Sequence, residues 1–440
     1  MIENPLDMLR DCVVGTFQPL AEPGLKKWFD GHIKIADDRA TIAVIAHKKR
    51  DPAAEWANDM ANSRIVAGIT EAGTVLAPVE AIHRSTTRGD FSMPVVRWHL
   101  GNLLVNVDFD EVDDDTISAS QLHYVGLGSW SGRPDHVDEP ITERDGYGWR
   151  IEVHPGQERT AEIDPAFDLT IEHDWTLTGP EDQRSLQRPL KVGVRSSERR
   201  ALREHVERLD AVHALLSIAH WKPVSAIRGV AQLAPGSKKR ALLWDHTMVA
   251  DVVRPDNNEF PVFTLADIGD LMGLAAWVNV CLTKPRAVTP IVRHRLFQNQ
   301  TPEARLLYTA AALEYWTASN ARNPDSPWAK KVPERKVPEA IGNSVGQAWE
   351  AWIGDPERWS KQFYGTYVQL KHTANLVDPD VVDALEYSGR WLLAASILDQ
   401  CAASTAPSYR IFSGRGLRYP VPGQVRGVLD EAPVPRDDRR

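Results

Sequence analysis

Cysteine is scarce in this 440-residue chain: it contains 3, and they lie far apart at Cys12, Cys281 and Cys401. Because no Cys-x-x-Cys pair occurs, neither a disulfide framework nor a thiolate zinc site is indicated. We therefore expect the three cysteines to be buried, reduced thiols.

Long apolar runs are also missing. No window approaches the run of about 20 apolar residues that spans a bilayer, and the N-terminus lacks the basic and apolar regions of a secretory signal. These absences predict a cytoplasmic protein without membrane contact. Positive charge is in deficit as well, since 51 Lys and Arg stand against 60 Asp and Glu, a formal net charge of −9. A nucleic-acid site, if there is one, must therefore be local.

Several signatures of cofactor and metal chemistry are absent. The chain has no Walker loop, no Gly-x-Gly-x-x-Gly and no His-Glu-x-x-His, so nucleotide hydrolysis, hydride transfer and zincin proteolysis lose support. The acidic run at residues 108–115 lacks the ligand order of a calcium loop, and a solvated turn explains it better. The sequence thus predicts no metal ion and no cofactor.

Short β-branched runs, broken by Gly, Pro and Asp, dominate the first half of the chain. Strands are expected at residues 41–46, 64–69, 95–100 and 103–109. A helix is expected from about residue 198 to 220, with Ser196 or Ser197 as its cap, and two further strand-like runs follow it. These patterns predict a β-rich domain over residues 1–260 that includes one helix.

From residue 264 onward the apolar spacing is helical. One helix is expected at residues 265–282 and a second at 302–320, with Thr301 as cap. The cap-and-proline signal recurs at Asp378 before the last long helix. An antiparallel bundle over residues 261–412 is the economical arrangement, followed by an extended tail at 413–440 that is disordered at its end. The predicted fold class is α+β, a β-rich N-terminal domain followed by an all-α bundle.

Lys371 and His372 stand side by side at the expected end of one helix and just before the next. Cleavage of RNA by its own 2′-hydroxyl requires a group that accepts the hydroxyl proton, a group that protonates the departing oxygen, and positive charge near the phosphate. Imidazole can do the proton work, and a cation can stabilise the phosphate. The pair is therefore a candidate catalytic site, although a capping histidine and a surface lysine would explain the same residues.

Two further residues are candidates for supporting roles. Glu314, on the expected helix 302–320, can orient His372 or hold Lys371 by a salt bridge. Asn375 can bind RNA or cap the end of a helix, and capping is the simpler interpretation. A basic loop before the site can supply an RNA-binding rim for phosphates or can be a charged solvated loop; its candidates are Lys330, Lys331, Arg335 and Lys336.

Arginine followed by histidine at a short spacing also occurs outside the expected bundle. Such loose spacing arises easily by chance, and we interpret the histidines of the helix near 198–220 as part of a partly exposed polar edge. The pairs are Arg200 with His205, Arg208 with His213, and Arg240 with His246.

Tryptophan is abundant, with 15 in the chain. Exposed rings can stack on RNA bases, but helical packing explains most of them more simply. We expect most of those in the C-terminal half to lie in the core or in a dimer interface; they are Trp316, Trp349, Trp352, Trp359 and Trp391.

Both halves of the chain resemble one known family. Residues 65–76, 98–109 and 122–130 resemble the β-rich N-terminal domain of ApeA-type abortive phage-resistance proteins. The C-terminal half is similar to their HEPN domain; the resemblance rests on residues 274–277, 305–316 and 369–375. It spans most of the chain, as a likeness of pattern and order.

The resemblance implies a metal-independent endoribonuclease that is silent until phage infection and then cuts RNA, with tRNA as one candidate substrate. It also implies a homodimer through the helical domain, because HEPN domains usually pair face to face so that two copies share one cleft. A phage-derived trigger is a further implied partner.

The chain departs from the usual HEPN motif, an Arg followed by four to six residues and a His. With Lys371 at the Arg position, His372 falls at the usual Asn position and Leu376 where the His should be. Counting back from His372 reaches residues 365–367, none of which is basic. Two alternatives therefore stay open: an inactive HEPN-like protein that binds nucleic acid or a phage component as an interaction module, and a β-rich domain that binds a small ligand or glycan while the helices only dimerise.

Overall fold

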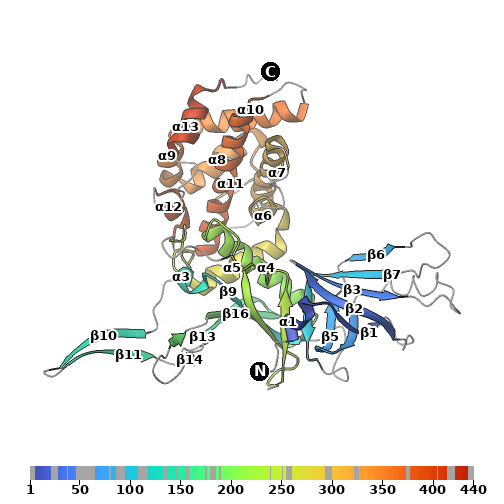
Figure 1. The fold of residues 1–440 in the computed structure, drawn as a ribbon. Helices are drawn as coiled ribbons and strands as arrows, with labels where there is room; N and C mark the ends of the chain where they lie inside the picture. The colour runs from blue at the N-terminus through green and yellow to red at the C-terminus, as the bar shows by residue number, and fades with distance from the viewer. Residues whose placement is uncertain are drawn as a thin grey trace.

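A computed structural model gives the architecture, in which a β-rich part and a helical part follow one another along the chain (Figure 1). The N-terminus lies beside the sheet and the C-terminus at the far end of the helices. The α+β fold class expected from the sequence is thus confirmed. The structure describes residues 5–20, 28–36, 38–45, 65–78, 81–85, 95–107, 117–131, 136–143, 146–153, 158–173, 176–178, 185–187, 190–237, 239–249, 251–253, 260–292, 300–321, 327–328, 330–372, 377–403, 405–413 and 422–434.

The β-rich part is built on a 14-stranded sheet whose described pairings are all antiparallel. The strand order is β12-β13-β16-β9-β17-β18-β8-β5-β4-β1-β2-β3-β7-β6. Their bounds are β1 Val13–Leu20, β2 Phe29–Ala36, β3 Arg39–Ile45, β4 Ile65–Thr70, β5 Gly73–Pro78, β6 Ala81–Ser85, β7 Val95–Leu100, β8 Asn102–Val105, β9 Ile117–Tyr124, β12 Arg159–Asp164, β13 Phe167–His173, β16 Leu190–Arg200, β17 Ala226–Gln232 and β18 Arg240–Asp245. Two separate hairpins are β10 His136–Glu143 with β11 Gly146–Val153, and β14 Thr176–Thr178 with β15 Ser185–Gln187.

The expected strands at 41–46, 64–69 and 95–100 are confirmed within two residues as β3, β4 and β7. The strand expected at 103–109 is β8, Asn102–Val105. Residues 108–115, the acidic run, lie outside the described part.

The long helix of the first half, α4, covers Leu202–Ala219 and packs on β16 and β9. It begins later than expected because β16 continues to Arg200. Ser196 is not a helix cap: its side chain is buried in the strand, where Oγ donates to the carbonyl oxygens of Glu198 and Ser118 at 2.6 and 3.2 Å.

The helical part is organised around α11, Pro379–Ala402, which is buried along most of its length and contacts α5, α6, α7, α8, α10, α12 and α13. α7 matches the expected 302–320, and Thr301 Oγ1 accepts a hydrogen bond from Ala304 N at 3.4 Å. Asp378 caps α11. The remaining helices are α1 Pro5–Arg10, α3 Leu127–Ser131, α5 Asp270–Thr283, α6 Pro285–Val292, α7 Pro302–Asn320, α8 Val337–Val345, α9 Gln347–Ile353, α10 Pro356–His372, α12 Pro407–Phe412 and α13 Pro422–Glu431, with a 3-10 turn, η2, at Glu334–Lys336.

Two expectations were wrong. The tail is not extended throughout, because α13 packs Val425 and Leu429 into the core; residues 435–440 lie outside the described part. Nor are all three cysteines buried: Cys401 is buried, Cys281 is partly buried and Cys12 is exposed. Cys12 lies between α1 and β1 and has a φ of 72°.

Tryptophans fill the core of the helical part, as expected. Trp349 stacks on Trp352 with ring centroids 5.6 Å apart and meets Trp359 edge to face at 4.9 Å. Trp316 and Trp391 are also buried. Aromatic burial of this size is a main source of core stability, so these rings serve packing within the chain.

The two parts share a packed junction. Trp277 Nε1 on α5 donates to the Ala211 carbonyl of α4 at 2.9 Å. Arg159 on β12 pairs with Asp270, the first residue of α5, at 2.7 Å. Trp221, just after α4, stacks on Trp391 of α11 at 4.8 Å. No helix in the described ranges has both the length and the apolar content required to span a membrane.

Candidate functional site

Lys371 and His372 are the last two residues of α10, and both are exposed. The carbonyl dipoles at a helix C-terminus favour positive charge, which suits both side chains. Asn375 lies outside the described residues, so its position relative to this pair is not part of the structure.

Tyr367, which lies one turn before Lys371 on α10, stands between Lys371 and Glu314 of α7 and contacts both. Lys371 Nζ donates to Tyr367 Oη at 3.5 Å and lies 5.4 Å from the ring centroid. The hydrogen bond from Lys371, together with the charges of Tyr367 and Glu314, raises the Lys371 pKa above its ordinary value. We call these three residues the Glu314–Tyr367–Lys371 cluster.

The electrostatics of this cluster involve the neighbouring loop. Partial burial, followed by the charge of Glu334, raises the pKa of Glu314, while Lys371, Tyr367 and Lys331 act in the opposite direction. Glu314 and Lys371 influence each other's pKa, with Tyr367 between them, and the two roles foreseen for Glu314 stay predictions. Within the described residues no hydrogen bond or ion pair joins Glu314 to His372.

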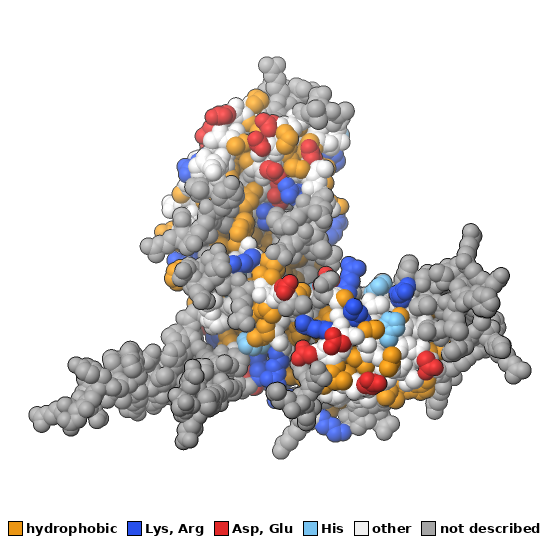
Figure 2. Space-filling view, in the orientation of Figure 1, with side chains coloured by type: hydrophobic (Ala, Val, Ile, Leu, Met, Phe, Trp, Pro, Cys, Tyr) orange, Lys and Arg blue, Asp and Glu red, His pale blue; other side chains and the backbone are white. Residues whose placement is uncertain are grey.

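The basic loop residues border this cluster and are exposed. Lys331 is close enough to influence Glu314, whereas Lys336 pairs with Glu339 at 2.6 Å. Basic and acidic side chains are likewise interspersed over the face drawn in Figure 2, without one large basic patch among its described residues. The four residues foreseen for RNA binding are all exposed, and that role stays a prediction; they are Lys330, Lys331, Arg335 and Lys336.

The histidines of α4 are structural. His205 is 0 % exposed, which corrects the expectation of a partly exposed edge: α4 turns this face onto β9 and β16. Its ring nitrogens lie 3.4 Å from Ser120 Oγ and 3.2 Å from Ser196 Oγ. Burial, aided by Arg208, lowers the His205 pKa to about 4. His213 Nε2 lies 2.7 Å from the Val224 carbonyl oxygen.

Residues 342–346 have the spacing Gly-x-Ser-x-Gly, which in hydrolases places a nucleophile on a sharp turn between strand and helix. Here the serine, Ser344, is inside helix α8, and its Oγ donates to the Ile341 carbonyl at 2.8 Å. The required context is missing, so the match is coincidental.

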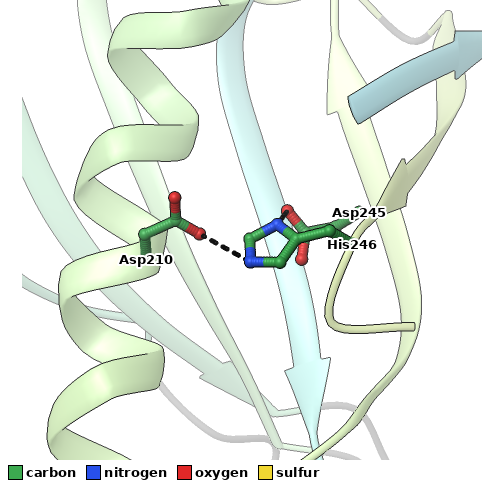
Figure 3. Close-up of side chains that lie close together, drawn as sticks. All are labelled: Asp210, Asp245 and His246. Carbon is green, nitrogen blue, oxygen red and sulfur yellow. Dashed lines mark ion pairs between the residues drawn. The ribbon is translucent and has the colours of Figure 1, made fainter. Parts of the chain in front are cut away.

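A second constellation, which no sequence motif marks, is formed by Asp210, Asp245 and His246 (Figure 3). His246 does not lie beside Arg240, the arginine that precedes it at a short spacing. Arg240 begins β18 and His246 follows its end, so the extended strand keeps the two residues well over about 10 Å apart. No spacing rule would have found Asp210, which comes from α4. Within the described ranges, this is the one group of His, Cys, Asp and Glu arranged to hold a metal ion.

Comparison with known proteins gives one match. The family model described as ApeA N-terminal domain 1 matches residues 15–276, which is more than half of the chain. The matched region begins inside β1, contains the rest of the described sheet and α4, and ends inside α5. Neither the curated proteins nor the solved structures contain a match.

Proposed function

The chain belongs to the ApeA family of abortive phage-resistance proteins, defined by its N-terminal domain, and on that premise we propose that its helical part is a HEPN-type, metal-independent endoribonuclease. The observation that carries the proposal is the exposed pair Lys371–His372 at the end of α10, beside Glu314 of α7. We further propose a cytoplasmic protein with its domains divided near residues 260 and 412.

The chemistry assigns one role to each residue of the pair. Imidazole exchanges protons near neutral pH, so His372 accepts the 2′-hydroxyl proton or protonates the departing 5′-oxygen. Lys371 stabilises the charge on the phosphate, as a point charge and without the bidentate fork of arginine. The Glu314–Tyr367–Lys371 cluster restricts where the ammonium group sits. The upstream fragment would end in a 2′,3′-cyclic phosphate, and the downstream fragment would begin with a 5′-hydroxyl.

A second copy of the chain completes this site. Cleavage uses one proton acceptor and one proton donor, whereas each chain brings a single histidine to the end of α10. A homodimer that sets two α10 ends in one cleft supplies both. RNA, with tRNA as one candidate, is the substrate, and a phage-derived signal releases the activity.

The alternative is an inactive HEPN-like module that binds nucleic acid or a phage component. It is favoured by the departure from the usual motif, since a lysine stands directly before the histidine. Lysine at a phosphate site retains binding more readily than catalysis that depends on bidentate contact.

The deciding experiment incubates the purified full chain with total RNA in EDTA and maps the RNA ends. His372→Ala and Lys371→Ala are compared with His32→Ala and Lys361→Ala, which change exposed residues elsewhere, the second on the same helix. Defined cuts with cyclic-phosphate ends, lost in the first two variants and kept in the controls, are the expected result.

A dormant enzyme would be silent in that assay, so RNA from phage-infected cells that express each variant is mapped as well. Absence of cuts there contradicts the nuclease. Phage protection that survives both His372→Ala and Lys371→Ala would favour the binding module.

A further inference from the structure

The imidazole of His246 lies between two carboxylates of the β-rich part, Asp210 of α4 on one side and Asp245 at the end of β18 on the other (Figure 3). Asp210 Oδ1 lies 3.9 Å from His246 Nε2, and Asp245 Oδ2 lies 3.6 Å from His246 Nδ1. One ligand atom from each residue can be chosen so that all three lie within 4.8 Å of one another.

The backbone holds this constellation rigidly. Asp245 is the last residue of β18, paired in register with Asn102 of β8. His246 N donates to the Gly101 carbonyl at 2.9 Å, and Met248 N closes a turn onto the Asp245 carbonyl at 2.8 Å. Asp210 is held by a helix whose neighbouring residues are packed on the sheet. Binding groups on rigid elements keep their geometry without ordering cost.

One oxygen of this group is buried without a hydrogen bond. Asp245 is 0 % exposed, and its Oδ1 accepts from Thr247 N and Thr247 Oγ1 at 2.9 and 2.5 Å. Its Oδ2 accepts no hydrogen bond from any described residue, and the 3.6 Å to His246 exceeds hydrogen-bond length. Buried polar atoms are ordinarily satisfied, so this oxygen points to a missing partner.

The local field is negative. Two carboxylates, Asp210 and Asp245, face the same imidazole. Burial, with the charges of Asp245 and Asp210 adding to it, raises the pKa of Tyr124 well above its ordinary value, which keeps the phenol neutral.

We propose that Asp210, Asp245 Oδ2 and one ring nitrogen of His246 bind a divalent transition-metal ion of the Zn²⁺ class. Metal–ligand bonds of about 2.0–2.2 Å place tetrahedral ligand atoms about 3.3–3.6 Å apart. Asp245 Oδ2 and His246 Nδ1 are 3.6 Å apart, and a set of three ligand atoms that includes Asp210 lies within 4.8 Å. An imidazole among carboxylates favours Zn²⁺ over Mg²⁺ or Ca²⁺. Two carboxylates also balance the charge of the ion.

The site is open on one side. The side chains of His246 and Asp210 are 40 % and 43 % exposed, whereas Asp245 closes the inner side. An ion therefore has an entry path, and three protein ligands leave a position for water or for an oxygen of a bound molecule. The site is built from the β-rich part alone, and it stands or falls independently of RNA cleavage at Lys371 and His372.

The test uses the untagged full chain, stripped with EDTA and then dialysed. Zn²⁺ binding is measured by calorimetry with Mg²⁺ in parallel, and the metal content is counted by mass spectrometry. Wild type is compared with Asp210→Asn, His246→Ala and Asp245→Asn, and with Glu207→Gln, an exposed carboxylate on the same helix. We expect one Zn²⁺ per chain, an affinity at least about tenfold weaker in each site variant, and wild-type affinity in Glu207→Gln.

A second readout separates metal loss from misfolding, because Asp245→Asn alters a buried residue. Zn²⁺ bound to the native state raises the unfolding temperature with ion concentration, and this rise should disappear in Asp210→Asn and His246→Ala at unchanged circular dichroism. Unchanged Zn²⁺ affinity in those two variants, or no Zn²⁺ bound to wild type, overturns the proposal. Equal affinity for Mg²⁺ overturns the assigned ion class.

Discussion

At the scale of single residues, His205 shows how burial fixes a protonation state. The imidazole lies between two serine hydroxyls, and Phe167 meets it edge to face at 5.2 Å. A pKa of about 4 makes this ring neutral at every pH near neutrality. A charged imidazole would need water that the interface between α4 and the sheet excludes.

This residue gives the fold a defined acid sensitivity. Because the folded-state pKa lies below the value of 6.5 in the unfolded chain, the unfolded state binds the proton more tightly, and stability falls as pH drops from about 6.5 towards 4. The full difference corresponds to about 3 kcal/mol. We expect His205→Gln to be less stable at pH 7.5 but to lose less stability on going to pH 5.

Urea unfolding at the two pH values checks this, with the exposed His32→Gln as control. The same pH dependence in wild type and His205→Gln would contradict it.

At the scale of elements, α10 and α11 approach closely because α11 has a glycine at the crossing. A Cβ on Gly389 would lie 2.5 Å from Phe363 Cε2 of α10, and both residues are buried. The helices therefore pack through a glycine–aromatic contact that no larger residue can reproduce without movement.

We expect Gly389→Ala to destabilise the protein by about 1–3 kcal/mol, since the strain of overpacking exceeds the gain in helix propensity. Gly427→Ala on α13 is the matched control. Nothing lies within 4 Å of its added Cβ, so the propensity gain of up to about 1 kcal/mol should appear unopposed. Chemical denaturation of both variants measures the difference, and equal effects in the two would refute the packing argument.

The sequence predicted best the helices whose first residues are a capping side chain followed by proline. Thr301 with Pro302, and Asp378 with Pro379, mark helix starts locally, and α7 and α11 begin there. The sequence predicts the start of α4 too early because Ser196 belongs to β16. This strand is stabilised by pairing with β9, which is far away in sequence. Strand order is non-local in the same way.

The candidate sites also differ in how far the sequence could predict them. Glu314 and Lys371 were linked from helix positions, and the structure brings them together through Tyr367, which the sequence did not single out. The constellation of Asp210 and His246 depends on how α4 lies across the sheet. Such a contact follows from tertiary packing and leaves no spacing in the sequence.

At the scale of the whole molecule, aromatic and ionic contacts join the sheet to the helices. Trp221 stacks on Trp391 and meets Tyr387 edge to face at 5.8 Å, with the Arg390 guanidinium 5.9 Å from its ring centroid. Arg390 itself pairs with buried Glu386 at 2.9 Å. The junction is therefore a packed interface, which favours unfolding of both parts together.

We expect Trp221→Ala to loosen this coupling by about 2 kcal/mol, because the stacked ring is lost while neither core is opened. Scanning calorimetry should then separate one transition into two. Phe260→Ala, which changes a side chain 84 % exposed, should leave the profile as in wild type. If Trp221→Ala kept a single, equally sharp transition, the coupling would have to come from other contacts.

The position of α5 has a consequence for any attempt to divide the chain. β12 is the outermost strand at one end of the large sheet, and α5 packs against it. An outer strand left bare presents unsatisfied amide and carbonyl groups to other chains. We expect a fragment that ends at residue 260 to lose the packing of α5 on β12. Its end strand would then be more open to pairing with strands of other chains.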